Sequence, residues 1–211
     1  MKRRTKSYDG SRPISTGALT REIGGFLLDQ VSQTFVVGDV IPAGTLARRD
    51  ETTRKVLIIK TGKVKAIDES DAKIVTLESD AFLAPIFAVG DKVLKTVSGT
   101  YANAPSINAI SDTENGYVIT LSAAIDGLAV GDVLQNVYKN SSNAAIYKAN
   151  CVVVSDTLIR EDGNETIVDV CADTMQYAIY ERRILPVVAG QKDTTGVYLS
   201  ENPHIRFTQL L

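Results

Sequence analysis

Histidine, cysteine and tryptophan, on which many binding and catalytic sites depend, are scarce in this chain. Its 211 residues include one histidine (His204), two cysteines (Cys151 and Cys171) and no tryptophan. A structural zinc site usually takes four Cys or His ligands. A catalytic triad would have to use His204, which directly follows Pro203. We therefore expect no metal site, no cofactor, no small-molecule substrate and no enzymatic activity.

Aromatic residues, long apolar runs and phosphate-binding motifs are also rare or missing. Aromatic residues make up 6% of the chain, which disfavours a platform on which sugars or single-stranded bases would stack. No window approaches the roughly 20 consecutive apolar residues of a membrane-spanning helix. No apolar stretch follows the basic residues 2–4, as it would in a secretory signal. Nothing matches a Walker loop, and the acidic cluster 68–71 lacks the glycine of a calcium loop. A membrane partner is not expected.

Charge is distributed unevenly along the chain. Residues 1–21 hold six basic residues against Asp9 alone, a net charge of +5, and the rest of the chain carries −7. Glycine and proline interrupt residues 1–30, which predicts an extended arm with at most a turn or two of helix. A basic arm on an acidic body suggests a contact with nucleic acid or with an acidic protein surface. The alternative is a disordered, solvated N-terminus.

The side chains of this arm are the candidates for partner binding. Such an arm gains affinity when it becomes ordered on a partner, either by adding a strand or by neutralising charge. Apolar side chains lie among the basic ones, and they suit pockets on a protein better than a phosphate backbone. The candidate partner-binding residues are Arg3, Arg4, Lys6, Tyr8, Arg12, Ile14, Leu19 and Arg21.

After the arm, the sequence pattern is that of strands. Residues 55–60 form an apolar run rich in β-branched residues, and residues 63–67 begin with clean alternation, so the two segments predict a hairpin. Further strands are expected over 74–77 and over 176–185. No long segment shows a persuasive helical period.

Two more hairpins are predicted from their turn residues. Asn115-Gly116 tolerates the positive φ angles of a type I′ turn. Asp162-Gly163-Asn164 is a second turn signal, and it lies between Cys151 and Cys171. Two cysteines are too few for a disulfide framework, so we expect buried free thiols that lie near each other across this hairpin. The paired segments are 107–111 with 117–121, and 151–155 with 166–171.

One short motif, Val-Gly-Asp followed by apolar residues, occurs three times. Glycine supplies a permissive backbone and aspartate bonds to its own turn, so each copy should precede a strand. The spacing is too irregular for a solenoid or propeller. The second and third copies bracket residues 88–138, which predicts a small inserted subdomain. The copies begin at Val37, Val89 and Val130.

The predicted fold class is mainly β, with a compact β-barrel or β-sandwich-like domain, an inserted small β subdomain and an extended N-terminal arm. The predicted parts are the arm (1–33), the main β domain (34–87 and 139–190), the insertion (88–138) and a C-terminal segment (191–211).

The segment Ile41-Pro42-Ala43-Gly44-Thr45-Leu46, followed by residues 50–53, resembles the opening of tailed-bacteriophage head decoration and head fiber proteins, including those of crAss-like phages. Residues 127–132 and the strand expected before Leu185-Pro186 are similar to parts of the same proteins. The resemblance spans roughly residues 35–188. It implies a β-rich protein on the outer capsid surface, often a trimer, whose N-terminal arm grips the major capsid protein. It implies no catalytic residues.

We therefore expect a virion protein, made in the host cytoplasm, that binds the outside of the capsid and decorates or cements capsomers. The major capsid protein is the expected partner, and a homotrimer is the candidate oligomer. Little chain follows Leu185, which favours a compact decoration protein over a full fiber. The alternatives are the capsid-proximal base of a head fiber and a nucleic-acid-binding protein that uses the basic arm.

Overall fold

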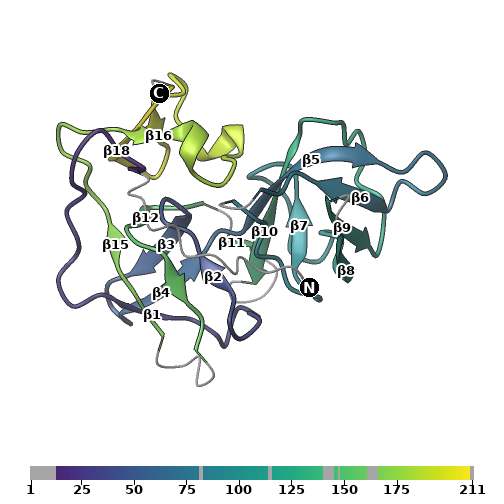
Figure 1. Cartoon of the computed structure of the whole chain (residues 1–211), viewed down its shortest axis with the longest axis horizontal. Coiled ribbons are helices and arrows are strands. Elements are labelled where there is room, and N and C mark those ends of the chain that lie inside the picture. Colours follow the sequence, from purple (N-terminus) through teal and green to yellow (C-terminus); the bar gives the residue numbers. More distant parts are fainter. Residues whose placement is uncertain are drawn as a thin grey trace.

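Strands account for almost all regular structure in the computed structural model, which describes residues 13–80, 83–113, 116–139, 145–146, 148–160 and 166–209. The strands form two bodies that lie side by side in Figure 1. The predicted mainly β fold with a barrel-like sheet is confirmed. Within the described part of the chain, no helix is long and apolar enough to cross a membrane.

The first barrel is a six-stranded sheet in the order β14-β1-β4-β3-β12-β15. β14 and β15 follow each other in the chain on either side of Asp169, so the two ends of the sheet meet and the barrel closes. The Asp169 carbonyl accepts a hydrogen bond from the Val154 N–H at 2.9 Å. The strands are β1 (Phe26–Leu28), β3 (Leu46–Asp50), β4 (Lys55–Ile58), β12 (Cys151–Val153), β14 (Ile167–Val168) and β15 (Val170–Cys171).

Alternate residues of these strands fill the first barrel. Phe26 and Leu28 of β1 are buried whereas Leu27 between them is exposed, and Val56 and Ile58 of β4 are buried. Successive side chains of a strand point to opposite faces, so a two-residue period separates the interior from the outside. The interior also includes Ala47, Cys151, Val153, Val168 and Val170.

The second barrel contains six strands around its own core. The order β7-β10-β5-β6-β9-β8 is closed by an antiparallel bridge between Lys92 and Ser106. A short strand, β11 (Ala145–Ile146), pairs with the end of β10. The barrel strands are β5 (Thr61–Ile67), β6 (Ile74–Leu77), β7 (Lys92–Leu94), β8 (Ile107–Thr113), β9 (Gly116–Leu121) and β10 (Val133–Lys139), and the core holds Val64, Val75, Leu77, Phe87, Ile119 and Leu134.

The C-terminal part covers one outer face of the first barrel. Leu46, Val152 and Cys171 point outward from that barrel and pack against Ile205 and Phe207. The elements of this part are β16 (Ile179–Tyr180), the 3₁₀ helices η2 (Glu181–Arg183) and η3 (Ala189–Gln191), β17 (Tyr198–Leu199) and β18 (Asn202–Thr208), and the short pair β2 (Val40–Ile41) and β13 (Thr157–Leu158) lies elsewhere on the same body.

All three Val-Gly-Asp copies form turns that lead into strands, as predicted. Gly38, Gly90 and Gly131 have φ angles of 84°, 94° and 93°, the left-handed region that the third position of a type II turn requires. In the second and third copies the aspartate carboxylate accepts the N–H of the alanine three residues earlier, at 2.8 and 2.9 Å. The strands that follow are β2, β7 and β10.

The local strand predictions had mixed outcomes. The 74–77 strand is confirmed as β6, and the predicted pairings of 107–111 with 117–121 and of 151–155 with 166–171 are confirmed as β8 with β9 and β12 with β15. Residues 115 and 162–164, on which the two turn predictions depend, lie outside the described residues. The 55–60 and 63–67 hairpin is wrong, because β4 pairs with β3 in one barrel while β5 pairs with β10 in the other. The long strand over 176–185 is also wrong, because the chain turns into η2 after Tyr180.

The inserted unit is larger than the predicted 88–138. β5 pairs with β6 and β10, and β6 pairs with β9, so residues 61–87 belong to the second barrel and not to the main domain. Side chains of β5 and β6 fill the same core as those of β9. The chain enters and leaves the second barrel at one place, where the Asn136 N–H donates to the Lys60 carbonyl at 3.0 Å.

Candidate functional site

Residues 13–23, here called the strap, lie across the outside of the first barrel. The strap runs antiparallel to β16. The Tyr180 N–H donates to the Ile14 carbonyl at 2.8 Å, and the Thr16 N–H donates to the Ala178 carbonyl at 2.9 Å. These are the hydrogen bonds of a strand added to the edge of a sheet.

The structure places three of the eight predicted partner-binding residues, and all three contact the protein itself. Ile14 and Leu19 pack against the cluster beneath the strap, and Arg21 Nη1 lies 2.8 Å from the Asp169 carboxylate. The predicted arm of residues 1–33 therefore does not hold for residues 13–33, because their apolar side chains gain by burial on the barrel. The other candidates, Arg3, Arg4, Lys6, Tyr8 and Arg12, lie outside the described residues.

Gly44, in the motif that carries the phage resemblance, makes room for this docking. Its φ angle of 84° lies in the left-handed region that favours glycine. A Cβ at this position would lie 2.0 Å from Ile184 Cγ2 and 3.6 Å from Ile14 Cδ1. The turn around Gly44 thus forms part of the floor on which the strap lies.

Three more side chains complete this floor. A Cβ at Gly17 would lie 2.1 Å from the Tyr177 ring, so the strap lies flat on that ring. Thr20 Oγ1 donates to Met175 Sδ at 3.4 Å, and the Thr20 N–H donates to Cys171 Sγ. We call Cys171, Met175, Tyr177 and Ile184 the strap groove. Sequence reasoning missed it because its residues lie some 150 positions from the strap and carry no local signal.

A pair of glycines links the strap to β1. Gly24 and Gly25 have φ angles of 83° and 60°. Arg54 Nη2 donates to the carbonyls of Ile23 and Gly25, each at 2.7 Å, and its guanidinium lies 4.1 Å from the centre of the Phe26 ring. The link is therefore held by one arginine at a point where the backbone adopts conformations that glycine favours.

Both cysteines are buried and neither forms a disulfide, as predicted. Burial raises the pKa of Cys151 to about 12 and also raises the pKa of Cys171. The thiolate is the nucleophilic form, and both buried thiols remain protonated at neutral pH. His204 is exposed on β18. Among the described residues, no group of three His, Cys, Asp or Glu side chains could hold a metal ion.

A buried ion pair lies at the junction of the two barrels. Lys60 Nζ is 2.7 Å from Asp91 Oδ2, and the two side chains are 0% and 6% exposed. Lys60 Nζ also donates to the Thr34 carbonyl and lies 4.3 Å from the centre of the Phe35 ring. Burial lowers the pKa of Lys60, and Asp91 opposes this effect. The pair connects the Val-Gly-Asp turn of the second barrel to the first barrel.

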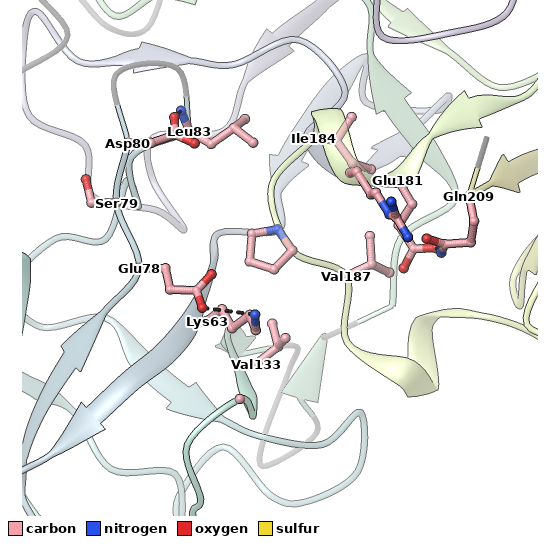
Figure 2. Close-up of a pocket in the computed structure, with 13 residues that line it drawn as sticks. Lys63, Glu78, Ser79, Asp80, Leu83, Val133, Glu181, Ile184, Val187 and Gln209 are labelled. Atoms are coloured by element: carbon pink, nitrogen blue, oxygen red, sulfur yellow. Dashed lines mark hydrogen bonds and ion pairs between the residues drawn. The ribbon is translucent and has the colours of Figure 1, made fainter. Parts of the chain in front are cut away.

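An open cleft of about 590 Å³ separates the second barrel from the C-terminal part. Figure 2 shows Lys63 and Glu78 on one wall and Glu181 and Gln209 on the other. Lys63 and Glu78 form an ion pair at 2.9 Å, and Glu181 accepts from both Lys192 and Gln209. Each of these two carboxylates is thus paired with a neighbouring cation or amide.

A comparison of the chain with protein-family models, with curated proteins and with solved structures finds no match. The feature with the clearest geometry for a macromolecular contact is the strap, which is anchored in its groove and directly follows the basic residues 1–12.

Proposed function

We propose that this chain is a structural protein of a tailed-phage virion. In this proposal residues 1–12 bind the major capsid protein on the outside of the capsid, and the two barrels decorate or cement capsomers. The observation that carries the proposal is the anchoring of the strap, because it fixes the C-terminal end of the basic segment at one place on the body. The resemblance of residues 41–46 to head decoration proteins agrees with it.

Charge supports a protein partner. Of the 23 basic and 25 acidic residues, residues 1–12 hold five basic and one acidic, so this segment carries +4 and the rest of the chain carries −6. A basic segment on an acidic body attracts an acidic protein surface at short range, while the body repels a phosphate backbone at long range. Ile14 and Leu19 pack on the body and therefore do not contact the capsid in this proposal. Tyr8 is then the aromatic side chain among the proposed contact residues that can enter a pocket of the partner.

The test is sedimentation of the protein with undecorated capsids, alongside binding to duplex DNA at the same salt concentrations. Deletion of residues 1–12 leaves the strap intact, and we expect it to lower capsid affinity by at least about tenfold, as loss of several charge contacts should. The triple variant R3Q/R4Q/K6Q should show most of this loss. The matched control is K65Q/K73Q/K139Q, which removes the same charge from exposed positions on the body.

Two outcomes would count against the proposal. Equal losses in the two triple variants would mean that overall charge, and not the N-terminal segment, drives binding. Tight, salt-sensitive binding to DNA without capsid binding would favour the nucleic-acid alternative.

A further inference from the structure

The strap is held on the body by contacts that any copy of the chain could provide. It adds to the edge of β16 by strand-type hydrogen bonds at Ile14 and Thr16. The side chains of Ile14 and Leu19 are only partly buried, and the Arg21–Asp169 ion pair is largely solvated, with side chains 59% and 32% exposed. We propose that the strap is exchanged between copies, so that the strap groove of one copy binds residues 13–23 of a second copy.

The link between strap and barrel permits this exchange. Gly24 and Gly25 can change their backbone angles at little steric cost, and the neighbouring Ile23 is 93% exposed. Only this link has to cross between two copies, because residues 13–23 themselves lie in the strap groove.

A second copy is a suitable partner because the contacts made within one chain and between two chains are identical, so exchange gives up no interaction in the strap groove. The effective concentration of a short tether is on the order of 1 mM, so exchange prevails when copies are crowded above that level, as on the surface of a particle.

Introduced thiols can detect the exchange, because Thr20 Oγ1 and Met175 Sδ lie 3.4 Å apart at the surface. One chain carries T20C and the other M175C, both with C171S, which removes a competing thiol; the single-chain variant T20C/M175C/C171S shows whether the strap still docks in this background. The chains are refolded together at about 1 mM and oxidised. We expect a covalent heterodimer, and within a single chain the double variant T20C/M175C should close its own disulfide when dilute. The matched control pairs T20C with S98C, whose introduced thiol is exposed on the second barrel.

The double variant first shows that the introduced thiols can form a disulfide within one chain. If it does so, but the T20C and M175C mixture yields no more heterodimer than the T20C and S98C mixture, the proposal is overturned.

A second measurement uses the unaltered protein. Exchange requires the strap to lift from Cys171, whereas Cys151 stays inside the barrel. We expect Cys171 to react with a thiol reagent at least about tenfold faster than Cys151, and equally slow reaction of both would overturn strap release.

Discussion

At the scale of single residues, the Lys60–Asp91 pair lends itself to a direct test. Removing one member of a buried ion pair leaves the other charge unpaired and costs about 3–5 kcal/mol. We expect D91N to lose stability of this order in urea unfolding, because Lys60 is fully buried. The control is E78Q, which breaks the exposed Lys63–Glu78 pair and should cost about 0–1 kcal/mol. Similar losses in the two variants would contradict this account.

The same pair predicts a dependence on pH. Burial lowers the pKa of Lys60 in the folded state below its ordinary value of 10.5, and loss of Asp91 should lower it further. Between the folded and unfolded pKa values, the unfolded chain binds the proton more strongly, so stability rises with pH. The loss of stability of D91N relative to the unaltered protein should therefore become smaller as the pH rises toward 10.5. A loss of stability that does not change with pH would show that it is not caused by the charge of Lys60.

At the scale of elements, the Val-Gly-Asp turns allow the stability cost of backbone strain to be measured without a change in side-chain packing. A Cβ at Gly90 or Gly131 would have no heavy atom within 4 Å, and both residues have φ angles near the left-handed region. Alanine should therefore cost only backbone strain, about 1–2 kcal/mol per turn. Asparagine tolerates this region better, so G90N should cost less than G90A. Urea unfolding midpoints measure both, and equal losses would argue against a backbone origin.

The elements that sequence predicts well are those whose partners are near in the chain. The two strands of the 107–121 hairpin pair with each other, so the Asn115-Gly116 turn signal between them is enough to predict the pairing. The 55–60 segment has the pattern of a strand, but its partner could equally be the following segment or the preceding one. It pairs with the preceding segment, β3, because β4 lies between β1 and β3 in the sheet of the first barrel. Likewise, only tertiary pairing with β4 and β14 makes residues 26–28 a strand and not part of an arm.

The candidate site was only partly predictable for the same reason. The sequence predicts that Ile14 and Leu19 bind pockets of a partner, whereas both pack against the body of the same chain. Sequence could not show that the pocket belongs to the same chain, since its walls come from residues beyond 170. Lys60 ends an apolar run, which is the pattern of an exposed strand end. Its burial depends on Asp91, which comes from the other barrel and is not near in the sequence.

At the scale of the whole molecule, the second barrel should be removable as a unit. Deleting residues 61–135 and joining Lys60 to Asn136 through two glycines retains every strand of the first barrel. K60M is included because the deletion removes the partner of its amine. We expect this variant to melt cooperatively by circular dichroism. Deletion of 88–138 instead leaves β5 and β6 paired only with each other, because it removes β9 and β10, and we expect no cooperative melting. The reverse ranking would mean that the two barrels share one core.

The closure of the first barrel through Asp169 also sets an order of events on the ribosome. The second barrel has all its strands once residue 139 is made, whereas β1 must wait for β14. At roughly 5–20 residues per second, the stretch between β4 and β14 takes about 5–20 s to translate. During that interval β1 has its parallel partner β4 but offers its other side to the solvent. The nascent chain is therefore most open to edge-to-edge association before its last barrel strand emerges.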